Sequence, residues 1–276
     1  MKTVSYSSEF TDVIALAKEK QFYVGTGNPS AKILFIGKEA AIDEKLYPEQ
    51  HQREIENNIS DWEKNIVTKM QFSDVDSWFR KDHQPTYNPL YPYKDQKNKI
   101  RSVRKKDGIV SVHGEGGTSK TWYNYQKIID TLISEGNTSL NINFHGHAFI
   151  SELNQITGPY SNTISKKDRK ISIQERKVLF EKPFFREFPI TIVAVGHYVR
   201  DFDINLQAIF MKTFHEALSK EYSQGLNDEY LNIHFDNPEK PTQLLIHTNQ
   251  LSMVSTELIT RIGQVCSLFL NGKINP

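Results

Sequence analysis

Short apolar runs alternate along the chain with longer segments in which apolar residues recur every three or four positions. The runs at 33–36, 190–195 and 244–246 are typical of strands that are buried on both faces of a parallel sheet. The periodic segments predict amphipathic helices at 10–17, 55–70, 122–133 and 254–269. Strands that alternate with helices predict an α/β fold, which we expect to be a three-layer α/β/α domain with a mainly parallel, four-stranded central sheet.

Other segments have weaker patterns. They predict strands at 109–112, at 140–144 leading into 148–154, and at 231–235, and helices at 172–188 and 209–218. The stretch at 72–108 is rich in Pro, Tyr and Lys and shows no clear periodicity. We interpret it as an insertion in a single domain that spans residues 1–276.

Length and composition are those of a soluble globular protein. The 276 residues, of which 38% are hydrophobic and 24% charged, are enough for a sizeable core. No apolar run approaches the ~20 residues that cross a bilayer, and the first twenty residues lack a secretory pattern. We therefore expect a cytoplasmic monomer without a membrane partner. The single cysteine, Cys266, lies in an apolar helical pattern and is expected in the core, and no metal or cofactor is expected.

The charge balance gives no general reason to expect a polyanionic partner. Lys and Arg total 34 and Asp and Glu total 33, so the net charge is +1. Locally, however, the basic stretch at 94–106 follows the aromatic, proline-rich stretch at 87–93. Basic residues beside aromatic ones suit a phosphate backbone with stacked bases. The alternative, a solvated surface loop, is the commoner origin of such a charge run.

Two segments about two hundred residues apart carry the most specific chemistry. Residues 37–41 read Gly-Lys-Glu-Ala-Ala after an apolar strand, and 247–252 read His-Thr-Asn-Gln-Leu-Ser after another. Loops that follow parallel strands meet at the carboxyl edge of a sheet, where α/β proteins bind ligands. We expect Glu39 and His247 to face one pocket there. Two alternatives remain open: Glu39 as a carboxylate at a helix N-terminus, and His247 as a partner of the backbone.

These segments and the order of elements resemble the uracil-DNA glycosylase superfamily. Residues 25–37 are similar to the Gly-Asn-Pro approach that leads bacterial members into their first catalytic motif, and Glu39 falls on the polar third residue of that motif in two branches. The late H-P-S-P-L-S motif aligns without gaps with 247–252 and keeps His247, Leu251 and Ser252. The resemblance implies the glycosylase fold and hydrolysis of the N-glycosidic bond of a base flipped out of DNA.

The resemblance also implies roles for individual residues. Glu39 would supply negative charge and position a water near the sugar, and His247 would stabilise charge on the departing base. The asparagine that reads uracil in the family falls on Glu152, with Asn154 two residues on. Further contacts are implied for Phe149, His113 and Trp122 at the base, and for Lys38, Lys120, Asn249 and Ser252 at the phosphates.

The departures from the family pattern concern the substrate. Thr248, Asn249 and Gln250 replace the Pro-Ser-Pro of the late motif, and the four cysteines of the iron–sulfur branches are absent. An ionised Glu152 can only accept hydrogen bonds, which argues against uracil and suits an amino-bearing base edge. The sequence thus predicts a glycosylase that acts on a damaged or deaminated base. The alternative is an inactive member of the same fold that binds nucleic acid or a nucleotide.

Two other patterns suggest chemistry less strongly. His145 and His147 have the H-x-H spacing of metal ligands, but no third ligand stands nearby in the sequence. Residues 114–121 match a P-loop except that Ser119 replaces its last glycine, whose flexibility lets backbone amides wrap a phosphate. We expect an ordinary glycine-rich loop there that touches a phosphate or substrate.

Overall fold

The computed structural model describes residues 3–76, 87–92, 100–105, 108–114, 119–133 and 142–274, with Asp76, 100–105 and 108–114 described by their backbone alone. The helices of these ranges are α1 (Ser8–Lys20), α2 (Pro48–His51), α3 (Asn58–Thr68), α4 (Phe72–Asp76), α5 (Lys120–Ile133), α6 (Lys166–Phe180), α7 (Pro183–Arg186), α8 (Tyr198–Asp201), α9 (Leu206–Phe210), α10 (Glu216–Ser223) and α11 (Thr256–Leu270). Short helical turns are η1 (Gln52–Glu56), η3 (Phe144–Gly146) and η4 (Ser161–Thr163). The strands are β1 (Thr26–Gly27), β2 (Ile33–Gly37), β3 (Ile100–Lys105), β4 (Gly108–Gly114), β5 (Ala148–Glu152), β6 (Ile190–Ala194), β7 (Thr213–Phe214), β8 (Leu231–Phe235) and β9 (Leu244–Thr248).

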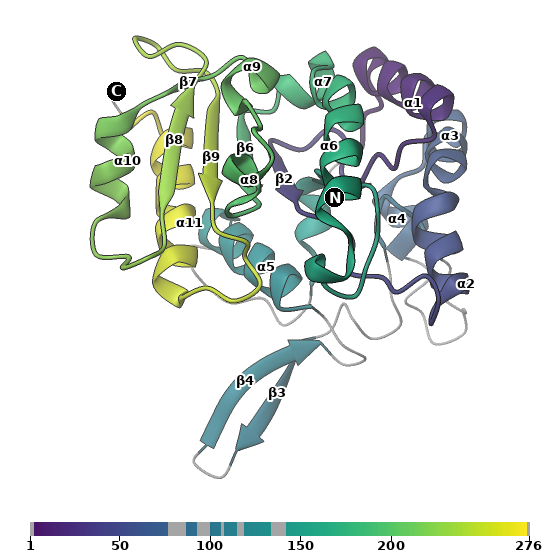
Figure 1. The fold of residues 1–276 in the computed structure, drawn as a ribbon, viewed down its shortest axis with the longest axis horizontal. Coiled ribbons are helices and arrows are strands. Elements are labelled where there is room, and N and C mark those ends of the chain that lie inside the picture. Colours follow the sequence, from purple (N-terminus) through teal and green to yellow (C-terminus); the bar gives the residue numbers. More distant parts are fainter. Residues whose placement is uncertain are drawn as a thin grey trace.

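The main sheet is mixed and has seven strands in the order β1-β5-β2-β6-β9-β8-β7 (Figure 1). Its four central strands, β5, β2, β6 and β9, run parallel. The strands β1, β8 and β7 add antiparallel pairs at the two sides. The sheet is thus larger than the four strands expected, in part because β1 and β7 have only two residues each and leave no pattern in the sequence.

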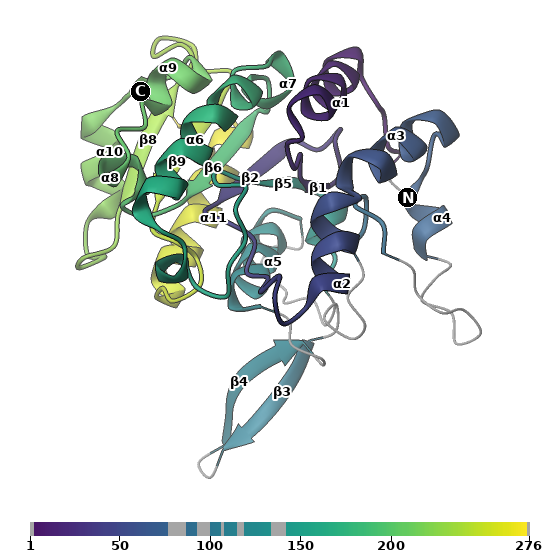
Figure 2. The same cartoon turned by 45° about the vertical axis from the view of Figure 1, so that its right-hand side comes forward.

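Helices cover both faces of this sheet, and each face has its own hydrophobic core (Figures 1 and 2). Successive side chains of a strand point to opposite faces. Leu34 of β2 therefore packs with α1, α3 and α6, whereas Phe35 packs with α5 and α11. The burial of β2 on both sides explains its unbroken apolar run. Cys266 of α11 is fully buried in the second core, as expected.

The strands β3 and β4 form a separate antiparallel hairpin. Both views show its backbone projecting away from the sheet and helices (Figures 1 and 2). The short strand expected at 109–112 lies in this hairpin and not in the main sheet. Because β4 continues to Gly114, the segment that departs from the main fold extends beyond the insertion expected at 72–108.

The strand expected at 140–144 is not formed in the described part of that segment, and Leu140 lies outside it. Ile142 and Phe144 are buried core residues, and Phe144 begins the turn η3. Gln126 of α5 explains the difference, because its Oε1 accepts the backbone N–H groups of Asn143 at 2.7 Å and Phe144 at 2.9 Å. A side chain thus takes the place of a neighbouring strand, and β5 begins only at Ala148.

Three helix predictions also need correction. The single helix expected across 209–218 is divided, because α9 ends at Phe210 and its C-cap, Met211, has a left-handed φ of 56°, before β7 and α10. The helix expected at 172–188 begins earlier, after the N-cap Ser165, and is followed by the separate α7. The last helix, expected at 254–269, begins two residues later, after the N-cap Ser255, whose Oγ accepts from the N–H of Leu258 at 3.0 Å.

Among the helices in the described ranges, none combines the length and the apolar character required to cross a membrane.

Candidate functional site

A cavity of about 200 Å³ lies at the carboxyl edge of the central strands. Gly37, Glu152 and Ala194, the last residues of β2, β5 and β6, line it, and Gln250 joins them from the loop after β9. This is the edge at which open α/β sheets bind ligands. The volume is below the about 300–1,000 Å³ of sites for drug-sized ligands, so it suits a small group such as one heterocyclic ring.

Gly37 and Glu152 meet at this edge because β2 and β5 pair in parallel with these two residues in register. A Cβ atom at position 37 would lie 2.1 Å from Glu152 Oε2, so the carboxylate lies directly over the glycine. The pairing continues past the strands, since the N–H of Leu153 donates to the carbonyl of Gly37 at 2.9 Å and the N–H of Asn154 to that of Lys38 at 2.7 Å. The loops that carry Glu39 and Glu152 are therefore held side by side.

Three donors hold the Glu39 carboxylate at the cavity wall. Ser161 Oγ donates to Oε1 through a short hydrogen bond, and Tyr198 OH donates to Oε2 at 2.8 Å. Asn154 Nδ2 lies 3.4 Å from the same Oε2. These donors come from η4, α8 and the loop after β5, so three separate parts of the chain fix the orientation of the carboxylate.

Two cations lie around the ring of Tyr198. Arg169 Nη1 donates to the Tyr198 hydroxyl at 3.0 Å, and Lys38 Nζ lies 4.7 Å from the ring centroid. Burial lowers the pKa of Lys38, and the charge of Glu39 partly opposes that shift. The positive charge of Lys38 therefore lies near the Glu39 carboxylate. Burial removes part of the water around the Lys38 ammonium group, which disfavours its charged form.

Aromatic residues form another part of the cavity wall. Tyr23, Tyr87, Trp122 and Tyr125 line it. Tyr125 stacks on Phe35 of β2 with ring centroids 4.1 Å apart, which fixes it against the sheet. Burial raises the pKa of Tyr125, and the Glu152 charge adds to the shift. The tyrosines at the site thus keep their protons at neutral pH, and Glu152 lies within electrostatic reach of Tyr125.

A second glutamate, Glu54 of η1, also lines the cavity and is buried. Its Oε1 lies 3.4 Å from Arg53 Nη2. Glu54 raises the pKa of Tyr23, after the larger effects of burial and of Glu152. Both glutamates therefore lie within electrostatic reach of Tyr23 in the aromatic part of the cavity.

A fully buried arginine supports the loop of Glu152 from behind. Arg176 of α6 donates through Nε and Nη2 to the Glu152 carbonyl at 3.2 and 2.9 Å, and through Nη1 to the Tyr23 carbonyl at 2.7 Å. Burial lowers the pKa of Arg176 to about 10, against the opposing effects of Tyr23 and Glu152. The guanidinium thereby joins two wall-forming segments that are far apart in the sequence.

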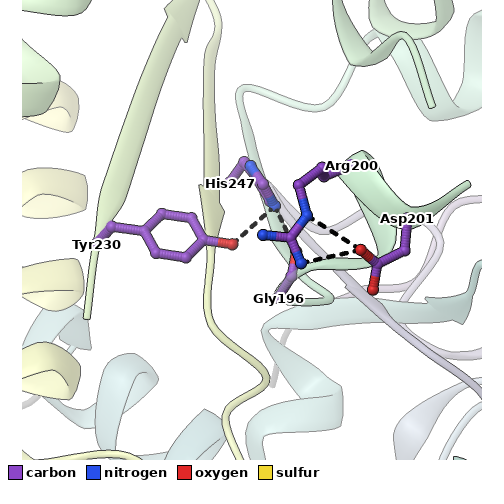
Figure 3. Close-up of polar contacts among 5 residues, drawn as sticks. All are labelled: Gly196, Arg200, Asp201, Tyr230 and His247. Atoms are coloured by element: carbon purple, nitrogen blue, oxygen red, sulfur yellow. Dashed lines mark hydrogen bonds and ion pairs between the residues drawn. The ribbon is translucent and has the colours of Figure 1, made fainter. Parts of the chain in front are cut away.

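His247 does not line this cavity. It lies at the end of β9 in a broader groove of about 610 Å³ on the side of β9 and β8. Its Nε2 lies 3.0 Å from the Gly196 carbonyl and 3.1 Å from Tyr230 OH (Figure 3). Because a carbonyl only accepts, Nε2 carries the proton, and Nδ1, 3.2 Å from Asn232 Nδ2, accepts. Burial lowers the pKa of His247, so the ring is neutral at pH 7.

Glu39 and His247 were expected to face one pocket, but in the structure they line two different cavities. Glu39 and Glu152 share the cavity, whereas His247 makes the backbone contact left open as an alternative. The other two residues in Figure 3, Arg200 and Asp201, pair with each other through two contacts of 3.0 Å beside the same groove.

The remaining candidates occupy different places. Asn154 is buried and contacts Glu39, so it supports the cavity wall from behind the lining residues. Phe149 is fully buried in the first core and does not line the cavity. Lys38 lines the cavity, and Lys120 begins α5 beside the lining residue Ser119. The side chain of His113 lies outside the described part of the structure.

The two phosphate-contacting candidates of the late motif lie elsewhere in its loop. Asn249 Oδ1 accepts the N–H of Tyr230 at 3.0 Å, so it joins two loops of the sheet edge. Ser252 is half-buried and precedes Ser255, the N-cap of α11, by three residues. The P-loop-like segment at 114–121 has its middle, 115–118, outside the described residues.

Several residues of the site were not predicted. Ser161, Tyr198, Arg169 and Arg176 reach it from α6, α8 and η4, which follow β5 or β6. The only sequence pattern near them is Gly196-His197-Tyr198, where a strand ends in a glycine before a helix. That pattern predicts a loop after the strand, but it does not predict the hydrogen bond from the Tyr198 hydroxyl to Glu39.

No metal centre is found in the part of the chain that the structure describes, where no group of three or more His, Cys, Asp or Glu residues is placed to hold an ion. His145 is buried and stacks on Phe144 with ring centroids 4.1 Å apart. Trp122 packs edge-on against His145 at 4.7 Å and also lines the cavity. His145 of the H-x-H pattern therefore belongs to an aromatic cluster with Phe144 and Trp122.

Comparison with the models of known protein families finds none that matches this chain, and comparison with curated proteins finds no match either.

Proposed function

We propose that this protein is a DNA glycosylase-like hydrolase that cleaves the N-glycosidic bond of a base turned out of the DNA stack. The observation that carries the proposal is the position of Glu39, a carboxylate fixed by Ser161 and Tyr198 at the wall of a ring-sized, partly aromatic cavity. Such a cavity accepts a base only when it leaves the duplex, which costs a few kcal/mol of unstacking.

The chemistry requires charge stabilisation at the sugar. Water adds to C1′ while the bond from C1′ to the base nitrogen breaks, and the bonding electrons and one proton go to the base. Positive charge develops on the sugar during this step, and the Glu39 carboxylate stabilises it and accepts a hydrogen bond from the attacking water. The donors on Glu39 keep it oriented before the substrate arrives. Lys38, beside Glu39, supplies positive charge for the DNA backbone.

The architecture supports the proposal in one further respect. Four parallel strands at the centre of the sheet, with helices on both faces, are the arrangement that the resemblance to uracil-DNA glycosylases implies. Within this proposal DNA is the partner, the protein acts as a cytoplasmic monomer, and the insertion at 72–108 belongs to a single domain.

A second candidate is an inactive protein of the same fold that binds nucleic acid or a nucleotide. Two observations favour it: Glu39 already receives three donors, and His247 is bonded to Gly196 outside the cavity. Under this reading the cavity binds a base, but no group activates water.

A cleavage assay separates the two candidates. The full-length protein is incubated with single-stranded and duplex oligonucleotides that carry uracil, hypoxanthine, xanthine, mismatched thymine, adenine or cytosine, and abasic sites are measured. We expect cleavage of at least one, a loss of about 100-fold or more in Glu39→Gln, and unchanged DNA binding. Glu44→Gln, which changes an exposed carboxylate that does not line the cavity, is the control. Salt-dependent binding with no abasic product would establish the binder instead.

A further inference from the structure

The cavity carries an excess of acceptors and negative charge. Within the described residues, its charged lining consists of Glu39, Glu54 and Glu152 together with a single cation, Lys38. Lys38 and Glu39 lie together on the Tyr198 side, as the 4.7 Å contact and the 2.8 Å hydrogen bond show. Glu54 and Glu152 line the same cavity as the aromatic residues, and both lie within electrostatic reach of Tyr23.

An ionised carboxylate reads a ligand differently from an amide. It has about four lone-pair positions and no proton, so it accepts several hydrogen bonds and donates none. Glu152 can therefore bind a ligand N–H in addition to its contacts within the protein. A base edge with two oxo groups would instead place its oxygen atoms against negative charge, which is unfavourable in a partly buried site.

Glu152 has close neighbours on two sides. In front, its carboxylate lies over the bare Cα of Gly37. Behind, Arg176 holds its carbonyl through two hydrogen bonds, at 2.9 and 3.2 Å. Arg176 thus holds the backbone from which the Glu152 carboxylate reaches the cavity, and selectivity increases when a ligand-binding group is supported by such contacts.

We infer that the cavity selects a base with an exocyclic amino group, which donates to Glu152 while its ring packs against the aromatic wall. This inference rests on the proposed function for its assignment of the ligand as a base, and it narrows that function to an amino-bearing damaged or mispaired base. A deaminated base, in which an oxygen replaces the amino group, is disfavoured because a site built to bind a donor rejects the analogue without it.

Matched pairs of nucleosides test this selectivity directly. Deoxycytidine and deoxyuridine differ by an amino or oxo group at one position, as do deoxyadenosine and deoxyinosine. Calorimetric titration of the wild-type protein should show about tenfold or tighter binding of the amino member in at least one pair. Glu152→Gln, whose amide both donates and accepts, should reduce that preference about fivefold or more, and Glu44→Gln should leave it unchanged.

The outcomes separate the inference from the proposed function. Equal or tighter binding of the oxo members, or no binding of any of the four nucleosides at millimolar concentration, would overturn the inference. An unchanged preference in a Glu152→Gln protein with a native melting temperature would also overturn it. An amino preference without cleavage of the oligonucleotides above would support the inference and remove the hydrolase, whereas cleavage of uracil and hypoxanthine alone would do the reverse.

Discussion

The Glu152 carboxylate lies so close to Gly37 that a single added methyl group at position 37 would meet its Oε2 at 2.1 Å. Gly37 ends one parallel strand and Glu152 ends its neighbour, so this contact joins the two loops of the candidate site. The glycine is required here for the close approach.

Substitution Gly37→Ala should displace the Glu152 carboxylate. Because the obstructing atom belongs to a flexible side chain, we expect a moderate destabilisation of about 1–3 kcal/mol and a larger loss of nucleoside binding. Urea unfolding and calorimetry measure the two effects. In Gly37→Ala/Glu152→Ala the obstruction is gone, so the stability costs of the two single variants should not add. Additive costs would show that the contact is not the cause.

Removal of the buried Arg176 guanidinium should lower the free energy of unfolding, because it joins two segments of the cavity wall. Arg176→Met leaves the carbonyls of Tyr23 and Glu152 without their donor, and we expect a loss of about 3 kcal/mol in the free energy of unfolding. The neighbouring Lys177 is exposed, so Lys177→Met should change stability by less than about 0.5 kcal/mol. Similar urea midpoints for the two variants would contradict the role given to Arg176.

His247 should matter for stability more than for cleavage. In His247→Gln the hydrogen bond to the Gly196 carbonyl is weakened, and we expect a loss of about 1–2 kcal/mol with cleavage and DNA binding within about threefold of wild type. Thermal unfolding and single-turnover cleavage are the measurements. A collapse of cleavage at unchanged stability would return His247 to the catalytic role that the glycosylase resemblance implies.

His234 should make stability depend on pH below neutrality. It is 6% exposed, and burial, followed by the charge of His247, lowers its pKa to about 4. Between about pH 6.5 and pH 4 the unfolded chain binds a proton that the folded one does not, so the stability contributed by the neutral ring is lost as the pH falls. Relative to His234→Gln, the wild type should lose about 2 kcal/mol between pH 7.5 and pH 4.5.

Urea unfolding at the two pH values measures the His234 effect. Parallel pH curves for the wild type and His234→Gln would show that His234 does not titrate in this range.

The sequence predicts the central elements well because they leave strong patterns. The apolar runs at 33–36, 190–195 and 244–246 become β2, β6 and β9, and the paired loops bring Glu39 and Glu152 to one cavity. The place of His247 depends on which face of β9 it occupies. Its ring contacts both Asn232, its partner in register on β8, and the Gly196 carbonyl after β6, and no short pattern specifies those contacts.

Elements held by side chains are the least predictable. Ile142 and Phe144 have the spacing of a strand, but Gln126 satisfies the backbone there. Likewise, the partners of Glu39 are separated from it by more than one hundred residues, as with Ser161 and Tyr198. Their approach depends on how η4 and α8 pack, and only the folded chain specifies that packing.

The two shortest strands of the main sheet, β1 and β7, lie at its two ends. Each offers only two residues, and each already has hydrogen bonds from outside the sheet: the N–H of Gly27 donates to the Pro89 carbonyl at 2.7 Å, and that of Phe214 to Gln207 Oε1 at 3.2 Å. Long open edges are templates for strand addition and for aggregation. The main sheet is therefore poorly suited to recruit a further strand, and a partner is expected to bind through side chains and loops.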